Sequence, residues 1–124
     1  MDIRLPASAK KIKIVKKQQF DAVFSHKKRM STDSILIYYR PSNNECSRLG
    51  IITSKKNARL AHDRNRIRRI LKEQFRSLYE QIPPYDFVVI SKKKAAEAQN
   101  QELRECFTRL IHKITRKCVK LPVN

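Results

Sequence analysis

Apolar residues recur at helical spacing in the middle of the chain. They lie three and four residues apart, as expected for one face of a helix packed on a core, and are Ile67, Ile70, Leu71, Phe75 and Leu78. The pattern predicts a helix that begins between Ala58 and Asp63 and ends near Tyr79, with Asp63 as its N-cap. The two prolines at positions 83 and 84 prevent further continuation.

Two further helices are predicted from the same periodicity. The longer one begins at Asn100, the expected N-cap, and its apolar stripe is Leu103, Cys106, Phe107, Leu110, Ile111 and Ile114. A shorter pattern of Phe20, Val23 and Phe24 predicts a helix over residues 16–26.

Three segments rich in β-branched and aromatic residues predict strands. They cover residues 34–40, 48–54 and 86–91, and the first two are close enough in sequence to form an antiparallel hairpin. Alternation places Leu36 and Tyr38 on one face of the first strand and Ile35, Ile37 and Tyr39 on the other. One face must meet the helices, and the other could be left partly open to solvent. Gly50, the single glycine of the chain, suggests a bulge or a close backbone approach. These elements predict an α+β fold, a two-layer sandwich of a small sheet with packed helices.

The charge of the chain narrows the choice of partner. With 29 Lys and Arg against 11 Asp and Glu, the net charge is +18, and the usual partner of such a chain is nucleic acid. A membrane surface is the rival anion, but the sequence has neither a long apolar run nor the apolar core of a signal peptide. We therefore expect a soluble cytoplasmic protein that does not bind membranes. We also expect residues 1–124 to form a single RNA-binding domain, with residues 1–12 and 119–124 flexible.

The positive charge is concentrated on the predicted middle helix. Nine of the 23 residues from 54 to 76 are Lys or Arg, and only Asp63 and Glu73 oppose them. Because so few acids are available for pairing within the helix, its cations can bind an external polyanion. The side opposite the apolar stripe carries Asn65, Arg68, Arg69, Lys72 and Arg76.

The sequence offers little for catalysis by the protein itself. His26, His62 and His112 are too scattered for a zinc site, and no DxD or ExxE pair lies on a convincing cleft for a two-metal nuclease centre. The three cysteines lack CxxC spacing and are expected to be reduced thiols. The lysines at 92–94 are expected to be a solvated charge run. We therefore predict no catalytic residue and no metal site on the chain.

Five segments in order resemble the protein subunit of bacterial ribonuclease P. They span roughly residues 11 to 115 and read KIKIVKKQQFDAVF, RLGIIT, SKK, RNRIRRILKEQFR and DFVVISKK. The RNR core alone is a weak pattern, but the ordered set is specific. The resemblance implies a sandwich like the second domain of ribosomal protein S5, with a left-handed βαβ crossover. It also implies that the catalyst is a separate RNA acting with magnesium ions bound by that RNA, and that the protein helps it remove the 5′ leader of precursor tRNA by endonucleolytic cleavage.

The resemblance assigns roles to individual residues of this chain. It implies a leader-binding set of Phe20, Phe24, Tyr38, Lys56, Arg64 and Asn65, and an RNA-subunit-binding set of Lys55, Arg66, Arg68, Arg69, Lys72 and Arg76. The implied partners are ribonuclease P RNA and the precursor tRNA leader, with no protein partner. Ile52 departs from the family, which commonly has Ser or Thr at this position.

Two alternatives remain open from the residues alone. Phe20 and Phe24 could be ordinary core residues of an amphipathic helix, with no RNA contact. The chain could also be a non-catalytic basic RNA-binding module, such as a ribosomal or RNA-chaperone protein. The combination of the two phenylalanines, SKK and RNR favours the ribonuclease P subunit, because aromatic faces and cations together suit single-stranded RNA of variable sequence.

Overall fold

The computed structural model of the protein describes residues 17–42 and 47–120, with side chains to residue 117. The elements, in chain order, are α2 (Lys17–His26), β1 (Arg29–Ser31), β2 (Ile35–Pro41), β3 (Arg48–Ile52), α3 (Ala61–Leu78), the 3-10 turn η2 (Tyr79–Gln81), β4 (Tyr85–Ser91), α4 (Lys93–Glu97) and α5 (Asn100–Lys120). The flexibility expected for residues 1–12 and 119–124 stays a prediction. Residues 1–12 and 121–124 lie outside the described part of the chain, and α5 continues to Lys120.

The strands form one sheet in the order β1-β2-β4-β3. β4 pairs antiparallel with β2 and parallel with β3, so β2 and β3 are not neighbours and the predicted hairpin is wrong. β4 is the most buried strand, and its apolar segment lies between β2 and β3. In this central position both of its edges are paired with neighbouring strands. The segment from β3 through α3 to β4 is therefore a βαβ crossover.

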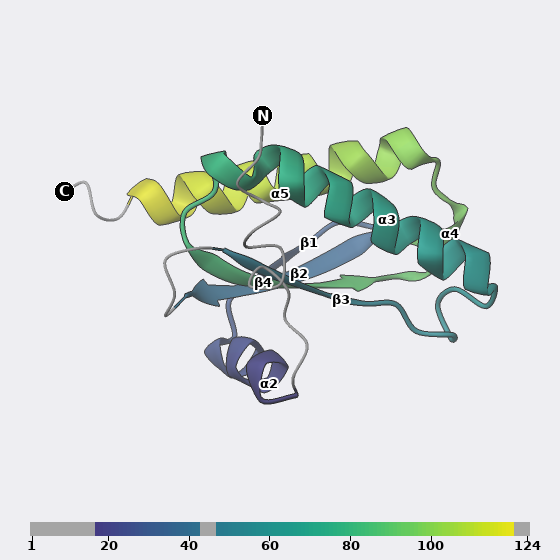
Figure 1. The fold of residues 1–124 in the computed structure, drawn as a ribbon, viewed down its shortest axis with the longest axis horizontal. Coiled ribbons are helices and arrows are strands. Elements are labelled where there is room, and N and C mark those ends of the chain that lie inside the picture. The colour runs from purple at the N-terminus through teal and green to yellow at the C-terminus, as the bar shows by residue number, and fades with distance from the viewer. Residues whose placement is uncertain (1–16, 43–46, 121–124) are drawn as a thin grey trace.

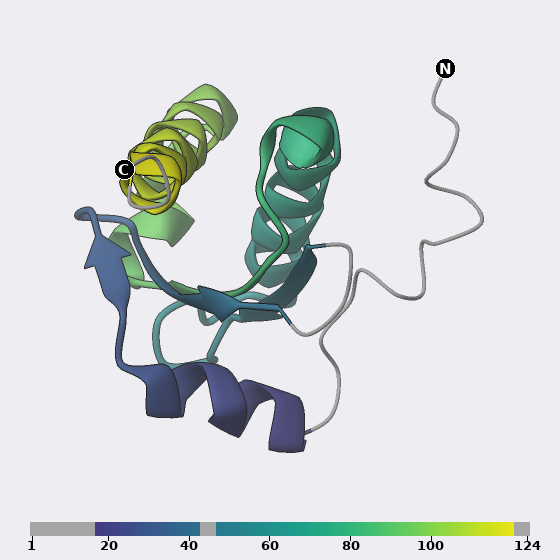
Figure 2. The same ribbon diagram turned by 90° about the vertical axis from the view of Figure 1, so that its left-hand side faces the viewer.

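Helices cover both faces of the sheet. Figure 1 shows α3 and α5 side by side above the strands and α2 below them, and Figure 2 confirms this arrangement from the side. The predicted α+β fold of a small sheet with packed helices is confirmed. The packing of α2 on the second face adds a third layer to the two that were expected.

The main core lies between the sheet and the pair of long helices. All five apolar residues predicted for the stripe of α3 are buried, as are those of α5 except the half-buried Cys106. The sheet contributes Ile35, Ile37 and Phe87 to the same cluster, so the face of β2 that carries Ile35 and Ile37 is the one that meets the long helices. Because the two stripes are fixed in this core, the opposite sides of both helices face solvent.

Both predicted helix caps are wrong. α3 begins at Ala61, and Leu60 occupies the N-cap position without a side-chain hydrogen bond. Asp63 lies in the first turn, where its carboxylate interacts favourably with the positive end of the helix dipole. α5 begins at Asn100, and the backbone N–H of the preceding Gln99 donates to Glu102 Oε1 at 2.8 Å. The side-chain oxygen of Asn100 accepts a hydrogen bond from Arg66.

Two short elements were not predicted. β1 has three residues and α4 has five, which is too short for a periodic pattern to show. The Lys92 ammonium donates to the carbonyl oxygen of Thr32 at 2.7 Å, so this lysine is not part of a solvated run. Lys93 and Lys94 are exposed on α4.

Candidate nucleic-acid interface

Three half-buried aromatic residues lie where α2 packs on the sheet. Val23 of α2 and Val88 of β4 are fully buried there, and Phe20, Phe24 and Tyr38 surround them; we call these three the aromatic group. The rings of Phe24 and Tyr38 meet edge to face, with centroids 4.9 Å apart and an interplanar angle of 85°. Each member is therefore anchored by packing while it keeps ring surface exposed, which combines the core role with a possible stacking surface.

The sheet surface beside the aromatic group is apolar. Ile52 and Ile90 pack against Val23 and Val88. Ile52, at the position where the family commonly has Ser or Thr, is therefore part of an apolar cluster. Gly50 is buried and lies opposite Val88 in unbroken register, without a positive φ. The predicted bulge at Gly50 is therefore absent.

Arg29 adds a cation to the aromatic group that sequence reasoning missed. It lies opposite Tyr38 across β1 and β2, donates from Nη1 to the Tyr38 hydroxyl at 3.2 Å, and places its guanidinium carbon 5.9 Å from the ring centroid. A cation at this distance is attracted by the ring face. The one sequence signal is the basic run Lys27, Lys28 and Arg29, whose geometry depends on the unpredicted strand β1.

The SKK segment forms a turn directly after β3. The Asn57 amide donates to the carbonyl oxygen of Ser91 at 3.0 Å, and its backbone N–H donates to Ser54 Oγ at 3.1 Å. These bonds tie the turn to the end of β4, and Lys55 and Lys56 are exposed on it. The turn begins two residues after Ile52, which packs against the same buried valines as the aromatic group.

The outer side of α3 is exposed and mainly basic, as predicted. Its exposed members, which we call the basic face, are Asn65, Arg68, Arg69, Lys72 and Arg76. Glu73 is the acid on this side, and it is shared between Arg69 at 3.7 Å and Arg104 of α5 at 3.4 Å. Exposed pairs at such distances contribute little stability, and they leave a surplus of cations for a polyanion.

Two arginines of the RNR motif point toward the chain's own backbone. Arg64 donates from Nη1 to the carbonyl oxygens of Ala58 at 2.8 Å and Arg59 at 3.0 Å, and so closes the loop before α3. Arg66 donates to the carbonyls of Ala96 and Ala98, both at 3.1 Å, and to Asn100 Oδ1 at 2.8 Å.

Arg66 therefore connects α3 to the segment between α4 and α5. Its Nε also lies 3.8 Å from the Asp63 carboxylate. Most of its donors are engaged within the protein, which gives this residue a structural role that the motif alone did not reveal. The RNA contacts expected for Arg64 and Arg66 stay predictions.

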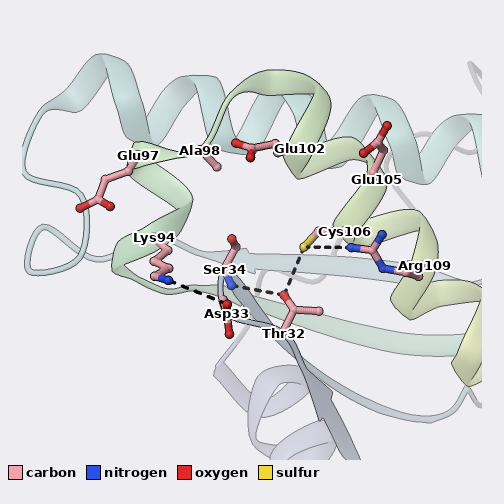
Figure 3. A pocket seen from close by; sticks show the side chains of 10 residues that line it. All are labelled: Thr32, Asp33, Ser34, Lys94, Glu97, Ala98, Glu102, Glu105, Cys106 and Arg109. Atoms are coloured by element: carbon pink, nitrogen blue, oxygen red, sulfur yellow. Dashed lines mark hydrogen bonds and ion pairs between the residues drawn. The ribbon is translucent and has the colours of Figure 1, made fainter.

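An open hollow of about 670 Å³ lies between the β1–β2 turn and the helices α4 and α5 (Figure 3). It is lined by four acids, Asp33, Glu97, Glu102 and Glu105, together with Thr32, Ser34, Lys94, Ala98, Cys106 and Arg109. Cys106 Sγ lies 3.3 Å from Thr32 Oγ1, so the thiol is in contact with the β1–β2 turn. Acids outnumber the two cations here, so the hollow carries a local excess of negative charge on a chain of net charge +18.

The described part of the chain contains no group of three or more His, Cys, Asp or Glu residues that could hold a metal ion. Within the same residues, none of the helices combines the length and the apolar character that a membrane span requires.

Sequence comparisons place the chain next to known proteins. The family model described as Ribonuclease P matches residues 9–115. A ribonuclease P protein component of Coxiella burnetii is 38% identical over 99 residues, which are 80% of this chain and 82% of the relative. One from Histophilus somni is 40% identical over 102 residues, with 82% and 86% covered.

Solved structures agree with the sequence relatives. The RNase P protein from Thermotoga maritima has a TM-score of 0.73 at 27% identity and covers 82% of this chain and 96% of its own. A mutant RNase P protein from Staphylococcus aureus has a TM-score of 0.80 over 93% and 98% of the two chains, and at 23% identity this likeness concerns the fold alone.

Proposed function

This chain belongs to the ribonuclease P protein family, and from that premise we propose how its surface is divided between two RNA ligands. It is the protein component of an endoribonuclease that acts with a catalytic RNA to remove the 5′ leader of precursor tRNA. The observation that carries this conclusion is the family match over residues 9–115. The alternative of a ribosomal or RNA-chaperone protein has no comparable support.

The first part of the proposal concerns the leader. The aromatic group, with Lys56 at its edge and Arg64 and Asn65 at the start of α3, binds the single-stranded leader. Stacking on aromatic faces tolerates any base, so it suits a leader whose sequence differs between tRNA genes. The half-buried rings and the edge-to-face contact of Phe24 with Tyr38 support this assignment, because they hold the platform rigid.

The second part concerns the RNA subunit. The basic face, with Lys55 and Arg66, contacts its phosphates. The exposure of Arg68, Arg69, Lys72 and Arg76 supports this assignment. We further propose that the magnesium ions of catalysis are bound by the RNA and that the complex works in the cytoplasm.

The division of labour between protein and RNA is tested by a cleavage assay. Rigorously RNA-free protein is expected to leave precursor tRNA intact, because the described residues include no group of His, Cys, Asp or Glu that could hold the metal ions for phosphodiester hydrolysis. Addition of the cognate RNA subunit is expected to give site-specific cleavage at low magnesium. Site-specific cleavage by the protein alone would contradict the proposed function.

The basic face is tested by the salt dependence of binding. Replacing Arg68, Arg69 and Lys72 together with Ala is expected to weaken binding of the RNA subunit and to reduce the log–log salt slope by somewhat less than one unit per lost contact. Folding should survive, because these positions are exposed. The matched control replaces the exposed Lys113, Arg116 and Lys117 of α5, which also removes three charges. Equal slopes for the two folded variants would refute the assignment of the basic face.

A further inference from the structure

Two arginines and one aspartate lie side by side across three strands. Arg40 of β2 is opposite Asp86 of β4, and Asp86 is opposite Arg48 of β3. The Asp86 side chain is fully buried. Arg48 binds it with two parallel hydrogen bonds, from Nε to Oδ1 at 2.9 Å and from Nη2 to Oδ2 at 2.8 Å. This bidentate geometry fixes Asp86 in the sheet.

Arg40 is held much less completely. Its Nη2 lies 3.5 Å from Asp86 Oδ2, an oxygen that already accepts from Arg48. Its Nε is buried and has no hydrogen-bond partner among the described residues, although the side chain as a whole is 21% exposed. A guanidinium stays charged in proteins, and a buried donor without a partner is costly. Arg40 therefore keeps charge and donor capacity that an anion can use.

These three charged residues lie on the same face of the sheet as the aromatic group. Side chains alternate along a strand, so Arg40 shares a face with Tyr38, Asp86 with Val88, and Arg48 with Gly50. Val88 and Tyr38 belong to the cluster beneath α2. Two residues along a strand correspond to about 7 Å, so one extended polyanion that lies on Tyr38 can also reach Arg40.

We propose that Arg40 binds a phosphate group of RNA, and that the Arg48–Asp86 pair holds it in position. The inference rests on the proposed function and extends it, because neither of the residue sets implied by the resemblance contains Arg40, Arg48 or Asp86. A planar guanidinium fork matches the oxygens of a phosphate, and partial burial strengthens the contact. The phosphate can come from the precursor leader or from the RNA subunit, and the experiment separates these sources.

The test compares Arg40→Gln with Arg109→Gln, which removes the same charge at the acidic hollow. Three affinities are measured for each protein across a salt series. The first is that of the protein for the RNA subunit, and the other two are those of the reconstituted holoenzyme for precursor tRNA and for mature tRNA. If the phosphate belongs to the leader, Arg40→Gln should weaken precursor binding about tenfold, lower the log–log salt slope of that binding by about 0.7 and leave binding of mature tRNA unchanged. If the phosphate belongs to the RNA subunit, the affinity of the protein for the RNA subunit should fall instead. Arg109→Gln should change none of them.

Folding is checked by thermal melting, and Arg40→Gln should fold because the Arg48–Asp86 pair is intact. Three unchanged slopes in folded Arg40→Gln would overturn the proposal. Arg40→Lys is the second variant: it keeps the charge and loses the fork, so its slope should match the wild type while its affinity falls. Wild-type affinity for Arg40→Lys would also overturn the proposal. A wild-type holoenzyme that does not prefer precursor over mature tRNA would count against the leader assignment instead, and the RNA-subunit arm would still decide whether Arg40 binds phosphate.

Discussion

Replacing Arg66 with Ala is expected to lower the free energy of unfolding by about 3 kcal/mol, because several charged hydrogen bonds are lost at once. The carbonyl oxygens of Ala96 and Ala98 and the amide of Asn100 would lose their donor, and the Asp63 carboxylate its ion pair. Urea denaturation of the full chain measures the change.

The matched control for this experiment is Arg68→Ala, two positions away on the same helix. Arg68 is exposed on the basic face, so its removal should change the free energy of unfolding by no more than about 0.5 kcal/mol. If Arg66→Ala is as stable as Arg68→Ala, the connection between α3 and the α4–α5 segment contributes nothing and Arg66 is available for RNA, as the motif implied.

Replacing Tyr38 with Ala is expected to weaken binding of precursor tRNA to the holoenzyme by roughly 1–3 kcal/mol, the value of one base stacked on an aromatic ring. Binding of mature tRNA, which has no leader, should hardly change. The ratio of the two affinities is therefore the measurement. Phe20 and Phe24 are poorer test sites, because the loss of a packed phenylalanine can cost about 3–5 kcal/mol of stability and imitate a binding defect.

The conservative control is Tyr38→Phe. It keeps the ring and its contact with Phe24, and it removes the hydroxyl that accepts from Arg29. If stacking dominates, this variant should keep most of the preference for precursor. A Tyr38→Ala protein that folds and retains the wild-type ratio would place the leader elsewhere on the surface, and a parallel Lys56→Ala measurement would show whether the SKK turn still contributes.

The buried sides of the long helices could be predicted because burial imposes a period on the sequence. Ile67, Ile70 and Phe75 had to share one side of α3 to reach the core, and they do. The choice of strand neighbours leaves no comparable period in the sequence of each strand. β4 lies between β2 and β3 although it follows them in sequence by a whole helix, so proximity along the chain gave the wrong neighbour.

The candidate interface was predictable to a similar extent. Exposed cations such as Arg68 and Arg69 follow from the helical period once the apolar stripe is known. The inward turn of Arg66 could not be predicted, because its acceptors are backbone carbonyls 30 and 32 residues away in the chain. Arg29 and Arg40 were missed for a related reason, since their partners lie on neighbouring strands.

The acidic hollow has a consequence for how the protein meets its ligand. In Figure 2 the β1 edge, with α5 above it, lies across the sheet from α3. α3 carries six Lys or Arg residues against two acids, whereas four of the 11 acids of the sequence line the hollow near β1. The local charge at the outer side of α3 therefore differs from that at the hollow. A polyanion is attracted more strongly to α3 than to the hollow, which favours encounters in which α3 faces the RNA. Such orientation accelerates association and fades as salt screens the field.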